Sequence, residues 1–291
     1  MSLLLRPLRD FHRRILRKVA PGPVDWFRAY RQRWRFCRAF RFDQRVFKEA
    51  FYPGNLRPEI LTGPFRGMRY LDEVVWGPIT PKWAGAYEME LHDLVAGFAA
   101  AGYDRIINIG CAEGYYAVGL ALLDSNATLY ALDFDPCARL QVRRLARVNG
   151  VSERIHVQGR CTVRRLNRLI TAGTLIVCDV EGEEAALIDP VKVPRLNQAD
   201  ILVEVHESTL DATATIQNLI TNRLLASHEI ECRVWSGRES WMEEHRSIWE
   251  GKVSPGRMMK SLDEARSGPQ VCLWAKSKLH ADSPIHDPDE R

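Results

Sequence analysis

The chain has 291 residues, of which 46% are hydrophobic, an ordinary fraction for a globular protein with a full core. This length favours one large domain with an extension. No apolar run approaches the roughly 18 residues of a membrane-spanning helix, and the start lacks the apolar core and cleavage site of a secretory signal. The seven cysteines include no C-x-x-C pair, so reduced thiols in a cytoplasmic protein are favoured over disulfides or zinc.

Positive charge is concentrated at the N-terminus. Residues 1–50 contain 14 Lys or Arg and 4 acidic residues, so the rest of the chain is net negative although the whole carries +4. Hydrophobic residues recur there at spacings of three and four, which predicts a helical extension. Its aromatic side chains can pack on the main domain while its arginines stay solvated, or the arm can contact a membrane surface or another anionic partner. A nucleic-acid partner is less favoured because the main domain is acidic.

Residues 51–84 are rich in Pro and Gly and have no helical period. They predict a cover segment over the main domain, with a turn, a strand and a hairpin within residues 63–70. A helix is expected to begin near Tyr87 and to run through Ala101, with acidic residues in its first turn. Gly102 then ends this helix.

The stretch 104–133 organises the main domain. It predicts a strand at 105–109, a glycine turn at 110–114, a helix at 115–123 and a second strand at 128–132 that ends on Asp133. This layout is typical of a nucleotide site at the carboxyl ends of parallel strands. The glycines let the backbone approach a ligand. Asp133 is placed to accept hydrogen bonds from the ribose hydroxyls.

Strands and helices continue to alternate after Asp133. A helix is expected to begin at Asp135-Pro136 and to end at Asn149-Gly150. Further strands are expected at 154–157, 174–178, 200–206, 229–235 and 270–276, with a helix at 209–226. The pattern predicts a mostly parallel sheet with helices on both faces.

Two motifs carry a resemblance to a known family. Residues 108–114, with Asp133, resemble the first two motifs of class I S-adenosylmethionine-dependent methyltransferases. Residues 176–184, IVCDVEGEE, are similar to the D-x-E-G-x-E signature of the FkbM-like branch, and 201–206 resemble its next strand. The resemblance covers residues 85–277. It implies a doubly wound, Rossmann-like α/β fold with a mostly parallel seven-stranded sheet whose last strand is antiparallel.

The resemblance also implies a cofactor and a substrate class. S-adenosylmethionine is the expected cofactor, and the expected reaction is O-methylation of a small hydroxylated molecule such as a sugar or polyketide. Asn108 and Cys161 stand where the family often has an acidic residue, so a cofactor-binding protein without transfer activity is one alternative. A methyltransferase acting on RNA or protein is another, motivated by the basic arm. The expected cofactor-binding residues are Tyr87, Glu88, Asn108, Gly110, Cys111, Ala112, Glu113, Gly114, Asp133, Phe134, Cys161 and Asp179.

Three side chains near later strand ends are candidate catalytic residues. Asp179 and Glu181 follow the fourth strand, and His206 ends the fifth. A hydroxyl acceptor needs a general base or a metal ion to lower its pKa. Asp179 and Glu181 can alternatively cap the next helix, and a lone histidine is often structural. With Glu204 these residues offer oxygen and nitrogen ligands, but no spacing demands a metal, so no metal ligand is predicted.

Two C-terminal segments fall outside the alternating pattern. Residues 236–269 form a long polar insertion with aromatic side chains, which predicts a lid or a substrate loop. Residues 278–291 contain Pro, Asp and His without an apolar period, which predicts disorder.

Overall fold

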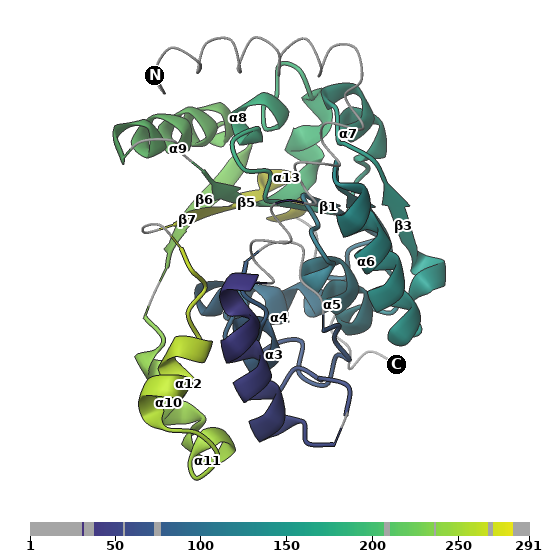
Figure 1. Cartoon of the computed structure of the whole chain (residues 1–291). Helices are drawn as coiled ribbons and strands as arrows, with labels where there is room; N and C mark the ends of the chain where they lie inside the picture. Colours follow the sequence, from purple (N-terminus) through teal and green to yellow (C-terminus); the bar gives the residue numbers. More distant parts are fainter. Residues whose placement is uncertain are drawn as a thin grey trace, which may run out of the picture.

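A central sheet organises the fold (Figure 1). The computed structural model of the chain describes residues 31, 38–54, 56–72, 77–206, 210–235, 237–266 and 270–281. These contain seven strands, namely β1 (Arg105–Ile109), β2 (Thr128–Leu132), β3 (Ile155–Gln158), β4 (Thr174–Cys178), β5 (Ala199–Val205), β6 (His228–Val234) and β7 (Val271–Ser277). Their order is β3-β2-β1-β4-β5-β7-β6. The first five strands are parallel, and β7 is antiparallel to both of its neighbours. The expected doubly wound sheet is confirmed.

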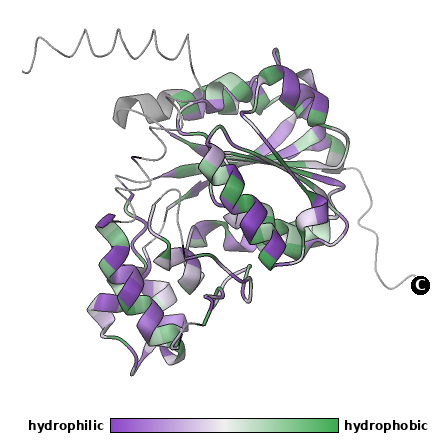
Figure 2. Cartoon of the chain, turned by 45° about the vertical axis from the view of Figure 1, so that its right-hand side comes forward, coloured by the Kyte–Doolittle hydropathy of each residue, from purple (hydrophilic) through white to green (hydrophobic). Residues whose placement is uncertain are grey.

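Helices cover both faces of this sheet (Figure 1). One face carries α4 (His92–Ala101), α5 (Tyr115–Leu123) and α6 (Pro136–Val148), and the other carries α7 (Val163–Leu169), α8 (Glu184–Leu187) and α9 (Leu210–Leu224). Short 3₁₀ turns lie at Met89–Leu91, Ser152–Arg154 and Pro194–Gln198. Successive strand residues point to opposite faces, so Ile106 joins one hydrophobic cluster and Ile107 the other. Figure 2 shows alternating hydrophobic and hydrophilic stripes along the outer helices.

The element boundaries follow local sequence signals. β1, β2, β4 and α5 have the bounds expected from the apolar runs, and the other strands differ by one residue. Asp135 caps α6 by accepting a 2.7 Å hydrogen bond from the backbone N–H of Cys137. Gly150 follows α6 with a φ of 72°, in the left-handed region that glycine tolerates.

The cover segment packs on α5. The expected turn lies at residues 64–67, and one antiparallel bridge joins Glu59 to Arg69. The backbone N–H of Ile60 donates to Met68 and that of Tyr70 donates to Pro58, so a short hairpin forms from residue 58 onward, whereas the expected strand is reduced to this bridge. The segment is held by side-chain packing: Tyr70 is fully buried, and a Cβ on Gly119 would lie 2.6 Å from the ring of Phe65. The segment ends in the short helix α3 (Thr80–Ala84).

The insertion is a helical unit beside the helix at residues 38–51 (Figure 1). It contains α10 (Glu239–Glu244), α11 (Arg246–Trp249) and α12 (Pro255–Ser261). Trp241 is buried and donates a 3.0 Å hydrogen bond from its ring nitrogen to Thr62 Oγ1. The insertion is therefore packed on the core, and its role as a lid stays a prediction.

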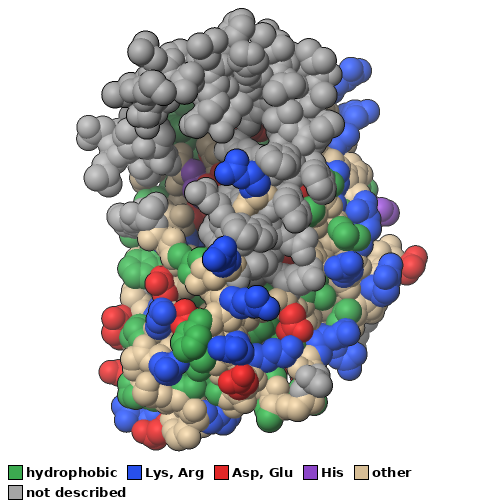
Figure 3. All heavy atoms as spheres, viewed as in Figure 1, with side chains coloured by type: hydrophobic (Ala, Val, Ile, Leu, Met, Phe, Trp, Pro, Cys, Tyr) green, Lys and Arg blue, Asp and Glu red, His purple; other side chains and the backbone are tan. Residues whose placement is uncertain are grey.

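Residues 38–51, which span the end of the extension and the first residue of the cover segment, are helical. Phe47 is fully buried in the main core, and Lys260 of the insertion lies 3.0 Å from Asp43. The helix thus belongs to the packed domain, although residues 1–30 and 32–37 lie outside the described part. Figure 3 shows Lys and Arg side chains gathered over this helix and the insertion, where Arg41, Arg45 and Arg257 are exposed.

The described part of the C-terminal segment is helical. Lys278–Ala281 form α13, so the expected disorder is wrong for these residues, and residues 282–291 lie outside the described part. The backbone N–H of Ser277 donates a 2.7 Å hydrogen bond to buried Asp200, which fixes the end of β7. Among the described helices, none combines the length and apolar character needed to cross a membrane.

Candidate functional site

The glycine turn between β1 and α5 is fixed by close backbone packing. Gly110, Ala112 and Gly114 have φ angles of 77°, 45° and 104°. A Cβ on Gly110 would lie only 1.5 Å from the backbone carbonyl oxygen of Asp179. No side chain fits there, so the turn requires glycine in order to cross the end of β4. The turn and Asp179 are therefore direct neighbours.

Asp133 completes this part of the site from the end of β2. Its Oδ2 accepts a 3.0 Å hydrogen bond from the N–H of Ala112, and its Oδ1 accepts one of 2.7 Å from Asp135. Burial raises the pKa of Asp133 to about 6, although these N–H groups favour the ionised form. Each carboxylate oxygen has more than one lone pair, so both can still accept hydroxyl donors. The adjacent Phe134 is 46% exposed.

Tyr87 and Glu88 reach the same region from the segment before α4. The ring of Tyr87 packs edge-to-face on Tyr115, with centroids 5.1 Å apart, and Tyr116 donates a hydrogen bond to Glu88. Both partners lie in the first turn of α5, directly after the glycine turn. Glu88 is buried and has a φ of 50°. The expected cofactor residues 87 and 88 therefore adjoin the glycine turn.

Glu113 is held in an internal ion pair. Its carboxylate is fully buried, pairs with Lys82 Nζ and accepts a 3.1 Å hydrogen bond from the hydroxyl of Tyr70. Both partners come from the cover segment. Glu113 therefore fastens that segment onto the glycine turn, a role that sequence reasoning missed.

Asn108, Cys111 and Cys161 are buried around the turn. The side-chain amide of Asn108 donates a 3.3 Å hydrogen bond to the carbonyl of Val177. Its Oδ1 is buried and has no hydrogen-bond partner among the described residues. Burial raises the pKa of the Cys161 thiol to about 11, so this thiol stays neutral at physiological pH.

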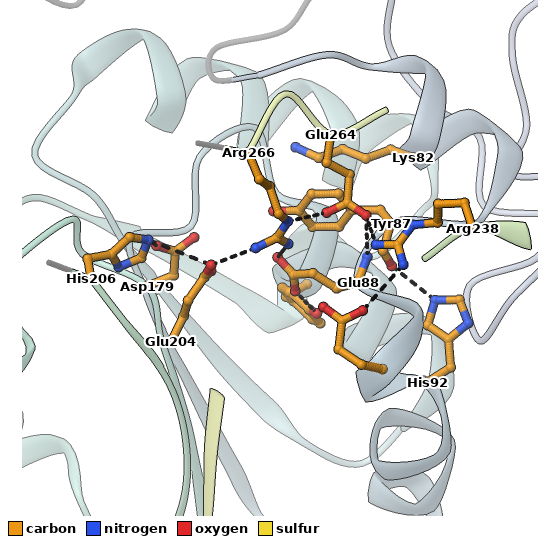
Figure 4. A network of polar contacts seen from close by, with 12 residues as sticks. Lys82, Tyr87, Glu88, His92, Asp179, Glu204, His206, Arg238, Glu264 and Arg266 are labelled. Atoms are coloured by element: carbon orange, nitrogen blue, oxygen red, sulfur yellow. Dashed lines mark hydrogen bonds and ion pairs between the residues drawn. The ribbon is translucent and has the colours of Figure 1, made fainter. Parts of the chain in front are cut away.

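The three candidate catalytic side chains lie together, and Figure 4 shows two of them, Asp179 and His206. Asp179, Glu181 and His206 each offer one ligand atom, and these atoms lie within 4.8 Å of one another. His206 Nε2 lies 3.7 Å from Asp179 Oδ1, which is too long for a hydrogen bond. Glu181 is exposed and has a φ of 54°. The parallel strands β4 and β5 end side by side, which brings the two sequence motifs into one group.

Glu184 orients the histidine of this group. Its Oε1 lies 2.8 Å from His206 Nδ1 and accepts a 3.1 Å hydrogen bond from the N–H of Gly182. Burial alone would lower the pKa of His206, but the hydrogen bond to Glu184 and the charge of Asp179 raise it to about 10. The ring is therefore protonated at neutral pH. Glu184 is the last Glu of the D-x-E-G-x-E motif, which is the signal that could have identified it.

The nearby carboxylates hold protons more tightly than usual. Burial raises the pKa of Asp179 to about 7; the charge of His206 opposes this shift and the charges of Glu88 and Glu181 add to it. Burial, with the charges of Asp179 and Glu88, also raises the pKa of Glu204 well above its usual range. The site therefore contains an excess of acidic groups.

Arg266 brings the insertion into the site (Figure 4). Its guanidinium lies 2.8 Å from Glu204, 3.2 Å from Glu88 and 2.6 Å from Glu264, and its side chain is 9% exposed. Arg238 from the same insertion also pairs with Glu264. Sequence reasoning placed Arg266 in the insertion but did not identify its ion pairs, because its partners Glu88 and Glu204 lie far away along the chain.

Comparisons with known proteins concern the fold. No protein-family model matches the chain, and no curated protein sequence matches it. The sheet topology is that of the class I methyltransferase, Rossmann-like α/β fold.

Several solved methyltransferase structures are similar to the chain. An O-methyltransferase from Bacillus cereus in complex with SAH is 13% identical, with a TM-score of 0.43 over 63% of this chain and 79% of that chain. The O-methyltransferase TomG from Streptomyces achromogenes, in complex with SAM, is 12% identical, with a TM-score of 0.44 over 66% and 80%. The precorrin-6y C5,15-methyltransferase from Geobacter metallireducens is 12% identical, with a TM-score of 0.41 over 63% and 86%.

Proposed function

We propose that the protein is an S-adenosylmethionine-dependent methyltransferase of the FkbM-like branch that acts on a hydroxyl of a small molecule such as a sugar or polyketide. One observation carries the proposal. Asp133 and the glycine turn lie at the same sheet edge as Asp179, Glu181 and His206. In this proposal, a nucleoside site and a polar reaction site are adjacent. The cofactor supplies a methyl group on a sulfonium, which is open to in-line displacement.

The residues around the glycine turn fit the nucleoside part of this cofactor. Asp133 is held by two backbone N–H groups and retains lone pairs for the ribose hydroxyls. Exposed Phe134 and buried Cys161 offer apolar surface to the adenine. Tyr87 and Glu88 would close the opposite side.

The group of Asp179, Glu181 and His206 is suited to binding the hydroxyl of the methyl acceptor. A hydroxyl must lose its proton as the methyl group is transferred, and positioned carboxylates can assist that loss. Asp179 and Glu181 supply carboxylates, and Glu184 holds His206 so that Nε2 faces Asp179. The group would therefore orient the hydroxyl in line with the methyl group, which supplies much of the rate enhancement in two-substrate transfers.

Turnover in an Asp179→Asn variant tests this assignment. The protein is incubated with S-adenosylmethionine and a pool of sugars and polyketides, and release of S-adenosylhomocysteine is measured. We expect the variant to lose about 10²–10⁴-fold in turnover, while its affinity for S-adenosylhomocysteine stays within about threefold. Glu183→Gln is the matched control, because Glu183 is exposed and pairs with Arg160 outside this group.

Two results would count against the proposal. Tight binding of S-adenosylmethionine without product release from any acceptor would favour a binding protein that performs no transfer. Equal turnover of Asp179→Asn and the parent protein would remove Asp179 from the reaction.

A further inference from the structure

We propose that Asp179, Glu181 and His206 bind a divalent metal ion, with one ligand atom from each side chain. Bonds from Mg²⁺, Mn²⁺ or Ca²⁺ to protein ligands are about 2.0–2.6 Å long, so two ligands of one ion lie roughly 3–5 Å apart. The three candidate atoms lie within 4.8 Å of one another. The 3.7 Å from His206 Nε2 to Asp179 Oδ1 also falls in this span.

One carboxylate oxygen of the group has no hydrogen bond within the described part of the chain, although His206 Nε2 lies 3.7 Å away. Asp179 Oδ1 is buried and accepts no hydrogen bond from the described residues. Leaving a buried carboxylate oxygen without a partner costs free energy. A cation between Oδ1 and Nε2 would satisfy this oxygen. Glu204 Oε1, also 3.7 Å from Nε2 and held by Arg266, is a further carboxylate oxygen beside the same position.

The histidine is held as metal-binding histidines are. Such residues nearly always give their second ring nitrogen to a carboxylate or carbonyl group. His206 Nδ1 lies 2.8 Å from Glu184, whose side chain is fully buried. Nε2 is thereby directed toward Asp179. A proton on Nε2 takes the place of the ion in the metal-free protein, and ligation releases it.

The donor set indicates the class of metal. Two carboxylate oxygens and one imidazole nitrogen, with no thiolate, suit Mn²⁺ and related divalent ions better than soft metals. The remaining coordination positions are left for water or an acceptor oxygen. Lowering the pKa of a bound hydroxyl would then be the role of the ion; this role rests on the proposed function, whereas ion binding does not.

Titration of the metal-stripped full-length chain with MnCl₂ tests the site. Electron paramagnetic resonance and calorimetry should show one Mn²⁺ per chain, with ¹⁴N coupling from the imidazole. We expect Glu184→Gln to weaken binding by about 10–100-fold, as substitutions of such orienting groups do. Glu181→Gln should weaken it by at least about tenfold and carries little folding risk, because Glu181 is exposed. The matched control, Glu183→Gln, should bind as the parent does.

Three outcomes would overturn the inference: no stoichiometric Mn²⁺ binding, equal affinities in Glu181→Gln and Glu183→Gln, or bound Mn²⁺ whose spectrum shows no nitrogen coupling. S-adenosylhomocysteine is titrated into the same preparation. If the protein binds S-adenosylhomocysteine but no Mn²⁺, the metal site alone is contradicted. If it binds Mn²⁺ but no S-adenosylhomocysteine, the proposed cofactor alone is contradicted.

Discussion

Because Asp133 is buried, both cofactor affinity and folding stability should depend on pH. Its pKa is raised to about 6, from about 3.9 in an unfolded chain. Ribose hydroxyls donate to the ionised carboxylate, so the affinity for S-adenosylhomocysteine should be full above pH 7 and fall toward tenfold per pH unit below pH 6. Folding stability should respond in the opposite sense. The raised pKa favours the folded state below about pH 4, and this contribution is lost as the pH rises through 6.

Calorimetric titrations between pH 5 and pH 8 measure this effect. Asp133→Asn is the control, because it keeps the size of the side chain but cannot ionise, and its affinity should vary less with pH. The same pH profile in both proteins would show that Asp133 does not control binding.

At the residue scale, strand ends were predictable and side-chain partners were not. Asp133, Asp179 and His206 directly follow apolar runs, so the sequence shows that they lie at one sheet edge. The bond between His206 and Glu184 and that between Glu204 and Arg266 depend on how separate elements pack. No local sequence pattern predicts these two contacts.

At the element scale, Arg266 ties the insertion to β5. Glu204 lies inside a strand whose residues are all buried, where a charge needs a partner. Replacing Arg266 by Met would remove the positive charge that pairs with the carboxylates of Glu204, Glu88 and Glu264. We expect it to lower the free energy of unfolding by about 3–5 kcal/mol, as measured by urea denaturation.

Arg246→Met provides the matched control for this comparison. Arg246 forms an exposed pair with Glu250 at 3.7 Å, and such surface pairs contribute about 0–1 kcal/mol. Similar losses of stability in the two variants would refute a structural role of Arg266 in anchoring the insertion.

The helices of the same insertion could not be predicted from the sequence. The central strands β1, β2, β4 and β5 are mostly apolar runs, and the bounds of all seven strands were identified within one residue. Helices α10 to α12 are short and are stabilised by tertiary contacts such as the buried Trp241. Their sequence is polar, so it resembles a loop until its packing partners are known.

At the scale of the whole molecule, truncation separates the arm from the domain. Removing residues 1–37 should leave the affinity for S-adenosylhomocysteine within about threefold, or about 0.7 kcal/mol. Removing residues 1–50 also deletes Phe47, which is fully buried. We expect that deletion to cost at least about 3 kcal/mol of stability, as truncation of a core Phe does.

Thermal and urea unfolding, with calorimetry, distinguish the two truncations. Loss of nucleoside affinity on removal of residues 1–37 would show that the arm helps to build the cofactor site. Equal stability of both truncated proteins would contradict the packing of residues 38–51 on the core.

Calorimetric titration of S-adenosylhomocysteine into the parent protein and Asp133→Ala tests the central claim most directly. The account predicts a micromolar dissociation constant for the parent. Loss of the charge-assisted hydrogen bonds, worth about 1.5–3 kcal/mol, should weaken binding roughly ten- to over a hundredfold in the variant. Equal affinity in both proteins would remove Asp133 from the site, and binding of NAD without any binding of S-adenosylhomocysteine would contradict the account.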